Sequence, residues 1–166
     1  LRRLARSGLK DVTKKYTFDG YQANTPWRQA IKEKGEQYCH DNGGAWFYIG
    51  GQSGAGKSHI CTAIAVQLIR QGKEVRYMVW RDEAPRIKGL ATEPDKYAAL
   101  VQELKTVDVL YIDDLFKDGK DRDGQYSRPT PADVKLAFEI INYRYNNTHL
   151  PTIISSDRTL MELIDI

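Results

Sequence analysis

The chain of 166 residues is 41% hydrophobic and carries 25 basic against 22 acidic side chains, for a formal net charge of +3. This length allows one globular domain with an apolar core and is short for two, and the mild charge does not by itself indicate a nucleic-acid partner. The two cysteines lie far apart and no apolar run is long enough to cross a bilayer, so we expect no zinc motif, no membrane partner and a cytoplasmic location.

The first residues form a basic arm. Residues 1–15 carry six basic side chains and a single acid, Asp11. Such a segment is either a solvated tail or a contact for nucleic-acid phosphates. We therefore divide the chain into a basic arm and linker over residues 1–25 and a folded core over residues 26–166.

Apolar patterning over the core predicts strands that alternate with helices. Thr25 and Pro26 are typical of a helix start, because a threonine hydroxyl can accept a backbone N–H there and proline fits the first turn. The predicted strands cover residues 45–50, 74–80, 107–114 and 150–157. The predicted helices cover residues 27–39, 57–72, 95–105 and 133–146, and another starts at Thr159. Residues 117–131 predict a loop, and the alternation predicts an α/β fold with a mainly parallel sheet flanked by helices.

A phosphate-binding loop follows the first predicted strand. Residues 51–58, GQSGAGKS, fit the Walker A pattern GxxxxGK[ST] in full and stand between a strand and a helix, as the mechanism requires. The glycines let backbone N–H groups surround phosphate oxygens, the helix N-terminus adds positive potential, Lys57 reaches the β- and γ-phosphates, and Ser58 binds Mg²⁺. The residues expected to bind the nucleotide are Gly51, Gln52, Ser53, Gly54, Ala55, Gly56, Lys57, Ser58 and, through its backbone N–H, His59.

A second acidic element is expected at the end of a neighbouring strand. The stretch VLYIDD, residues 109–114, supplies two aspartates there. Asp113 is expected to hold Mg²⁺ together with Ser58, and Asp114 to orient the attacking water. Aspartate is one methylene shorter than glutamate, so Asp114 has less reach, and a helix cap or a solvated loop acid is the alternative for this residue.

The aromatic stretch YTFDGY precedes the core. Tyr16, Phe18 and Tyr21 either line the adenine of a bound nucleotide or pack under the sheet. The sequence leaves both alternatives open.

The chain resembles, over residues 7–166, the ATPase domain of the DnaC/DnaI-type bacterial replicative helicase loaders, which are AAA+ proteins close to the IstB-like ATPases. The resemblance rests on SGLKDVTKKYTFDGY, GGQSGAGKSH, VDVLYIDDLF and FEIINYRYNNTHLPTIISSDRTLMELI. It implies a P-loop NTPase fold of AAA+ type, ATP and Mg²⁺ as ligands, and ATP hydrolysis coupled to placing a replicative helicase on single-stranded DNA by a homo-oligomer. An IstB-like protein would instead assist a transposase.

The same resemblance places a polar sensor residue at the end of the last predicted strand. By position the sensor is Ser156 or Asp157, and we expect Ser156 to act in catalysis. An acid facing the γ-phosphate would repel it, so Asp157 is expected to cap the helix that starts at Thr159 instead.

The resemblance also implies parts that this sequence does not show. An arginine finger, the C-terminal helical lid with its sensor-2 arginine, and a fifth strand beside residues 45–50 are all expected beyond Ile166. We therefore expect a C-terminally truncated core, with strand 45–50 at the sheet edge and with weak or absent ATPase activity outside the intact oligomer.

Two other classes of function share the phosphate loop. A nucleotide-gated DNA-binding module would bind ATP with negligible turnover. A small-molecule kinase would need an acceptor pocket with a base and lid arginines, and neither is recognisable in the sequence.

Overall fold

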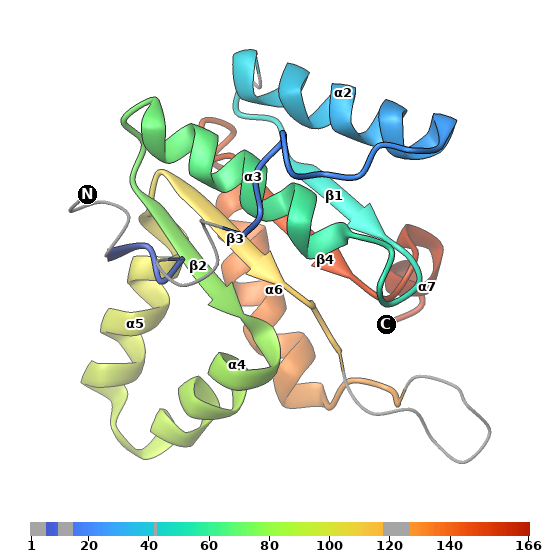
Figure 1. Cartoon of the computed structure of the whole chain (residues 1–166). Coiled ribbons are helices and arrows are strands. Elements are labelled where there is room, and N and C mark those ends of the chain that lie inside the picture. The colour runs from blue at the N-terminus through green and yellow to red at the C-terminus, as the bar shows by residue number, and fades with distance from the viewer. Residues whose placement is uncertain (1–5, 10–14, 42, 118–126) are drawn as a thin grey trace.

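The computed structural model describes residues 6–9, 15–41, 43–117 and 127–166. Its centre is a four-stranded sheet in the order β1-β4-β3-β2. The strands are β1 (Phe47–Gly50), β2 (Val75–Val79), β3 (Val109–Asp113) and β4 (Thr152–Ser156). All neighbouring strands pair in parallel, so their carboxyl ends meet along one edge of the sheet (Figure 1). The parallel sheet predicted from the alternating pattern is thereby confirmed.

Helices cover both faces of this sheet. They are α2 (Pro26–His40), α3 (Lys57–Arg70), α4 (Trp80–Gly89), the 3₁₀ turn η1 (Leu90–Thr92), α5 (Pro94–Thr106), α6 (Pro131–Tyr145) and α7 (Leu160–Ile164). Figure 1 shows α2 and α3 on one side, and α4, α5 and α6 on the other. This arrangement makes a three-layer α/β core.

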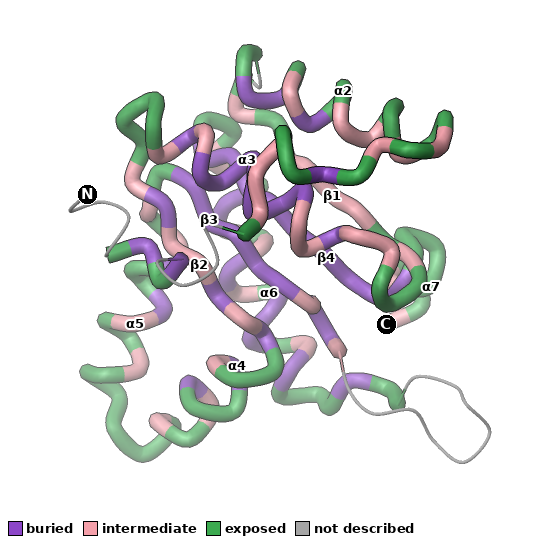
Figure 2. The backbone as a smooth tube through the Cα atoms, viewed as in Figure 1, coloured by how far each residue is buried: buried purple, intermediate pink, exposed green. Residues whose placement is uncertain are grey.

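The side chains of the central strands alternate between two apolar clusters. Tyr111 and Ile153 pack with α2 and α3, whereas Ile112 and Ile154 pack with the helices of the opposite face. Successive side chains of a strand point to opposite faces, so a strand buried on both sides is apolar throughout. Figure 2 accordingly shows β3 and β4 buried along their length. The same alternation decides which polar residues at the strand ends face α3.

Several element ends follow the sequence signals. Thr25 caps α2 and accepts the N–H of Arg28 at 3.4 Å. Gly72 ends α3 in a left-handed conformation with φ of 93°, where its N–H bonds the carbonyl of Ile69. Strand β1 pairs with β4 alone among the described strands, which is the edge position expected for it.

Three expectations need correction. The strand expected to run through Trp80 ends at Val79, and Trp80 opens the unpredicted helix α4, which contains Pro85. Thr159, not Asp157, caps α7, because its hydroxyl accepts the N–H of Glu162.

The basic arm is no simple solvated tail at residues 7–9, since Leu9 is fully buried. The rest of the arm at 1–5 and 10–14, and loop residues 118–126, lie outside the described residues.

Candidate nucleotide-binding site

The predicted phosphate loop connects the end of β1 to the first turn of α3. Gly51, Gly54 and Gly56 have φ values of 128°, 81° and 92°, in the region that glycine adopts without strain. Gly56 stands at the N-cap of α3 and provides no side-chain bond for the helix N–H groups. The backbone N–H groups of the first turn are therefore available for an anion, as the loop motif predicts.

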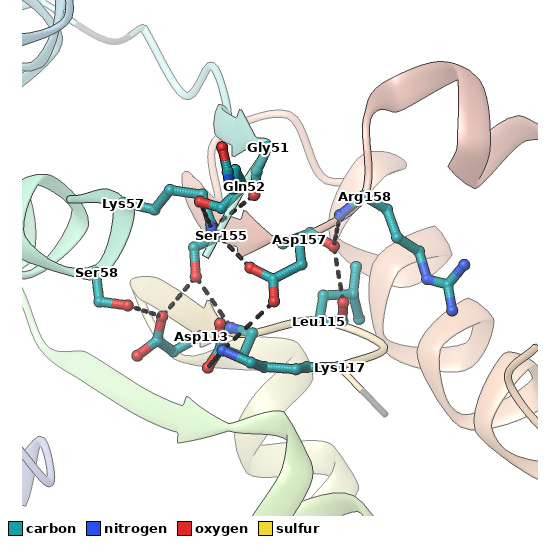
Figure 3. A network of polar contacts seen from close by, with 12 residues as sticks. Gly51, Gln52, Lys57, Ser58, Asp113, Leu115, Lys117, Ser155, Asp157 and Arg158 are labelled. Carbon is teal, nitrogen blue, oxygen red and sulfur yellow. Dashed lines mark hydrogen bonds and ion pairs between the residues drawn. The ribbon is translucent and has the colours of Figure 1, made fainter. Parts of the chain in front are cut away.

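Lys57 extends across this loop. Its ammonium donates to the carbonyls of Gly51 and Gln52 at 2.7 and 3.0 Å. The same ammonium pairs with Asp157 Oδ1 at 2.7 Å, and both side chains of this pair are buried, with exposures of 6% and 4%. The acid expected to cap a helix is thus a partner of the phosphate-loop lysine (Figure 3).

Asp113 lies beside Ser58, as predicted for two ligands of one magnesium ion. The Ser58 hydroxyl donates to Asp113 Oδ1 at 2.9 Å. Two further hydroxyls hold this carboxylate, because Ser155 donates to Oδ1 at 2.5 Å and Tyr77 donates to Oδ2 at 2.8 Å. Burial, together with the negative charge of Asp113, raises the pKa of Tyr77, so its phenol stays protonated and remains a donor.

The residues around Asp113 fit a magnesium ion. A hydroxyl and a carboxylate are the hard oxygen ligands that Mg²⁺ prefers, and a site with few protein ligands is completed by substrate phosphates and water. Among the described residues no cluster of three or more histidine, cysteine or acidic side chains could hold a metal by itself. Ser58 and Asp113 therefore fit a metal ion whose other ligands come from nucleotide phosphates and water.

Ser156 faces the other side of the sheet from Ser155. Its buried hydroxyl donates to the carbonyl of Leu115 at 2.8 Å and accepts the N–H of Arg158 at 3.1 Å. The catalytic role expected for Ser156 stays a prediction, since its hydroxyl is engaged with backbone groups of neighbouring loops. Sequence reasoning missed Ser155 and Tyr77, although strand alternation places both on the α3 face with Asp113.

Asp114 follows the strand in a left-handed conformation, with φ of 59°. Its N–H donates to the Ser155 hydroxyl at 3.0 Å, and its carboxylate pairs with Lys117 at 3.0 Å. A non-glycine residue in this region is strained and is held there by its surroundings. The role of Asp114 in orienting water stays a prediction, and within the described residues its carboxylate is neither a helix cap nor a freely solvated acid.

Lys117 links the two acids of the site. Its ammonium lies 3.0 Å from Asp114 Oδ2 and 3.5 Å from Asp157 Oδ2. Burial alone would lower the pKa of Lys117, but these two carboxylates outweigh it and raise that pKa. Charges of alternating sign therefore run from Lys57 through Asp157 and Lys117 to Asp114, as Figure 3 shows for the residues that it labels.

The aromatic stretch before α2 packs against the phosphate-loop helix. Phe18 and Tyr21 belong to the apolar cluster of that face, so the structure supports the core-packing alternative for these two residues. The ring of His59 lies 5.2 Å from that of Tyr21 and 5.0 Å from that of Tyr16 between centroids. A ring nitrogen of His59 is also 2.7 Å from the Thr17 carbonyl. His59 therefore does more than contribute a backbone N–H, and its ring fastens this stretch to the loop.

None of the helices in the described parts of the chain combines the length and the apolarity needed to span a membrane.

A parallel sheet flanked by helices, with a phosphate loop between β1 and α3 and a buried acid at the end of β3, defines the core of a P-loop NTPase of AAA+ type. No helical lid follows α7 within the described residues. The chain belongs to the family of IstB-like ATP binding proteins, which matches residues 4–165.

Curated relatives include two bacterial proteins. The Bacillus subtilis protein YqaM is 40% identical over 119 residues, which cover 70% of this chain and 35% of that protein. The replicative helicase loader DnaC of Buchnera aphidicola is 27% identical over 116 residues, which cover 68% of this chain and 47% of the loader. The chain thus spans less than half the length of these relatives.

Solved structures agree with this fold. A crystal structure of the DnaC helicase loader superimposes with a TM-score of 0.74 at 23% identity, over 89% of this chain and 80% of that chain. The replication initiator DnaA bound to AMPPCP and single-stranded DNA gives a TM-score of 0.69 at 25% identity, over 90% of this chain and 44% of that chain. The chain therefore has an AAA+ fold and is similar to the DnaC helicase loaders in both sequence and structure.

Proposed function

We propose that this chain binds Mg-ATP as the nucleotide-dependent switch of a protein that places a replicative helicase on single-stranded DNA. The observation that carries the nucleotide site is the Ser58–Asp113 contact of 2.9 Å, directly after the phosphate loop. The helicase and the DNA come from the relatives named as replicative helicase loaders and from the initiator structure with bound DNA. ATP is favoured as the nucleotide by the family description and by AMPPCP in that structure.

Each residue of the site has a proposed role. The loop N–H groups bind the phosphates, and Lys57 neutralises the β- and γ-phosphates once it leaves its present partners. Ser58 and Asp113 would hold Mg²⁺, which supplies charge neutralisation at the phosphates. Asp114 orients the attacking water, and Ser155 and Tyr77 fix the direction of the Asp113 carboxylate.

Hydrolysis by this chain alone is expected to be slow. The Arg158 guanidinium donates to the Ser127 carbonyl and that of Arg128 donates to the Asp165 carbonyl. An arginine from a neighbouring subunit typically contributes about 10³- to 10⁵-fold to turnover in such enzymes. We therefore propose ATP hydrolysis for the intact homo-oligomer, and nucleotide-gated binding with little turnover for this chain by itself.

A second candidate function follows from the matched family. The family of IstB-like ATP binding proteins matches residues 4–165, so the alternative is a role as a transposition helper with a transposase as the partner. Stimulation of a helicase or of a transposase separates the two. The cytoplasmic location expected from the sequence stays a prediction under either assignment.

The test is a pair of measurements on one sample. Calorimetric titration with ATP and ADP, with and without Mg²⁺, measures the site, and steady-state hydrolysis with and without single-stranded DNA measures turnover. We expect Mg²⁺-dependent binding with little turnover. Failure to bind either nucleotide would refute the site, whereas rapid turnover by the chain alone would refute the need for an arginine in trans.

A further inference from the structure

Asp157 has both carboxylate oxygens engaged in the candidate site. Oδ1 accepts from Lys57 at 2.7 Å, and Oδ2 lies 3.5 Å from the ammonium of Lys117. Its side chain is only 4% exposed, so water contributes little to stabilising its charge. Asp157 therefore depends on the two lysines.

Lys117 is shared in turn between two acids. Its shorter contact is with Asp114 at 3.0 Å, and its longer contact is with Asp157 at 3.5 Å. Lys117 is 28% exposed and Asp114 is 24% exposed, so this end of the chain of charges is more solvated than the Lys57–Asp157 end. Separating Lys117 from Asp114 consequently costs less than separating Asp157 from all of its partners.

A nucleotide at the loop changes this balance. An ammonium group has three N–H donors, and those of Lys57 already bond Gly51, Gln52 and Asp157. The β- and γ-phosphates therefore compete with Asp157 for Lys57. Once Lys57 turns to phosphate, the ion pair with Lys117 is the one that the buried Asp157 retains among the described residues. The attraction then draws Lys117 toward Asp157 and away from Asp114.

We propose that Asp157 and Lys117 are positioning residues that couple the binding of nucleotide phosphates at Lys57 to the release of the Asp114 carboxylate. The inference rests on the proposed nucleotide site, and it adds the route by which phosphate binding at Lys57 changes the contacts of Asp114. Asp157 acts as a competitor that the phosphates displace. Lys117 lowers the free-energy cost of this displacement, because it stabilises the Asp157 carboxylate after Lys57 has left.

This arrangement fixes the signs of two substitutions. Asp157→Asn removes the charge that holds Lys57, so affinity for Mg-ATP should rise, on the order of threefold to tenfold, because more of the protein is then competent to bind. Lys117→Met leaves Asp157 dependent on Lys57 alone, so affinity should fall by a similar factor. In the doubly substituted protein Lys117→Met should have little effect, because the acid that it serves is gone.

A direct role of Lys117 on the phosphates predicts a different result. A cation that simply attracts phosphate would, when removed, lower affinity by the same factor with or without Asp157. The experiment is therefore a double-mutant cycle, in which calorimetry measures Mg-ATP and ADP affinity for the unchanged chain, both single variants and the double variant. Equal effects of Lys117→Met in the two backgrounds, or a weaker affinity in Asp157→Asn, would overturn the coupling.

A second readout follows the Asp114 end of the network. The Lys117 N–H bonds the Asp114 carbonyl at 2.9 Å, and the Leu115 N–H bonds the Ser155 carbonyl at 2.9 Å. Hydrogen exchange at these two amides should rise when Mg-ATP binds the unchanged chain, and this response should be absent in Asp157→Asn. An identical response in both proteins would overturn the coupling even if the affinities change as expected.

Matched controls separate this inference from the proposed function. Lys105→Met removes a lysine that pairs with Glu139 at 2.7 Å, beside α6 and away from the loop, and it should change neither affinity nor exchange. Thermal unfolding of every variant checks that the fold is kept. Absence of Mg-ATP binding by the unchanged chain would refute the nucleotide site and with it the coupling, whereas normal binding with an additive cycle would refute the coupling alone.

Discussion

The hydroxyl of Ser155 on β4 donates to the carboxylate of Asp113 on β3 at 2.5 Å. The parallel register aligns Ile112 with Ile154, so the next residues on the two strands stand side by side at their carboxyl ends. The same hydroxyl accepts the N–H of Asp114 at 3.0 Å. One serine thus orients Asp113, the acid proposed to hold magnesium, and the backbone of Asp114, which follows it.

The neighbouring serines allow a matched comparison. Ser155→Ala removes the donor to Asp113, so affinity for Mg-ATP should fall about tenfold or more, since hydrogen bonds to charged groups contribute about 1.5–3 kcal/mol. Ser156→Ala removes a hydroxyl that bonds the backbone of Leu115 and Arg158, so it should lower the free energy of unfolding without changing Mg²⁺-dependent affinity. Calorimetry and urea unfolding measure the two effects. A larger fall in affinity for Ser156→Ala than for Ser155→Ala would contradict this division of roles between the two serines.

Tyr77 should tune the response to magnesium. Tyr77→Phe removes the hydroxyl that donates to Asp113 Oδ2 at 2.8 Å, so the Mg²⁺ concentration for half-maximal ATP binding should rise about threefold or more. The control is Tyr97→Phe, which removes a hydroxyl that donates to Glu139 at the same distance of 2.8 Å. Each change should lower the free energy of unfolding by about 1 kcal/mol. A shift in the Mg²⁺ requirement of both variants would show that the effect is not specific to Asp113.

Lys57 is the residue on which nucleotide binding should depend. Lys57→Ala removes the cation expected at the β- and γ-phosphates, so affinity for ATP should fall by about two orders of magnitude. The fold should remain, because Asp157 keeps Lys117 as a partner. Calorimetry together with circular dichroism checks both statements, and tight binding in a folded variant would refute the site assignment.

The basic arm requires charge changes rather than deletion. Deleting residues 1–15 would also remove Leu9, which is fully buried, and Ser7, whose carbonyl accepts the Tyr77 N–H at 2.8 Å. Replacing Arg2, Arg3, Lys14 and Lys15 by glutamine should instead weaken binding to single-stranded DNA.

The salt dependence of that binding supplies the check. For every DNA phosphate that the arm no longer neutralises, the slope of log affinity against log salt should become shallower by about 0.7. An unchanged slope in the substituted chain would refute a role of the arm in DNA binding.

The start of α6 should contribute acid-sensitive stability. Burial would raise the pKa of Asp133, but Lys88 and the Thr130 hydroxyl outweigh it, so the pKa lies below the usual 3.8. An acid with a lowered pKa in the folded state contributes stability above its unfolded pKa, and loses it as the pH falls through the folded value. Asp133→Asn should therefore lower the free energy of unfolding near pH 7, by about 1 kcal/mol for the weakened helix cap.

Acid titration of stability tests this assignment. The difference between the unchanged chain and Asp133→Asn should shrink as the pH falls below 3.8. Asp95→Asn, at an exposed position in the first turn of α5, is the control and should show a smaller difference at every pH. A difference for Asp133→Asn that is independent of pH would contradict the role of its charge.

Local signals were sufficient for most of the fold. Strand β3 is buried on both faces and is therefore apolar up to Asp113 at its end. The cap at Thr25 and the stop at Gly72 depend on short-range interactions. Helix α4 was missed because Pro85 breaks its pattern, although Trp80, Ala84 and Ile87 are buried at helical spacing. Its side chains make a helix only against the apolar cluster that they join.

The candidate site divides in the same way. The loop residues, Ser58 and Asp113 follow from a motif whose spacing carries its own mechanism. Ser155 could have been chosen over Ser156 by counting alternate residues from Ile153, which packs on the α3 face. The partners of Asp157 could not be found in this way, because Lys57 is 100 residues away in sequence and only the folded sheet brings the two charges together.

The buried Arg144 has a mechanical consequence. Its guanidinium donates to the carbonyls of Val107 and Pro151, each at 2.9 Å, and to the hydroxyl of Thr152 at 2.8 Å. These groups stand at the beginnings of β3 and β4, the ends opposite the phosphate loop. Arg144 thus links the beginnings of the two strands to each other, in addition to the backbone pairing between them. A displacement of β4 that starts at Asp157 would therefore meet its strongest resistance at Arg144, so we expect it to be larger at the carboxyl end of the strand, beside the phosphate loop, than at its beginning.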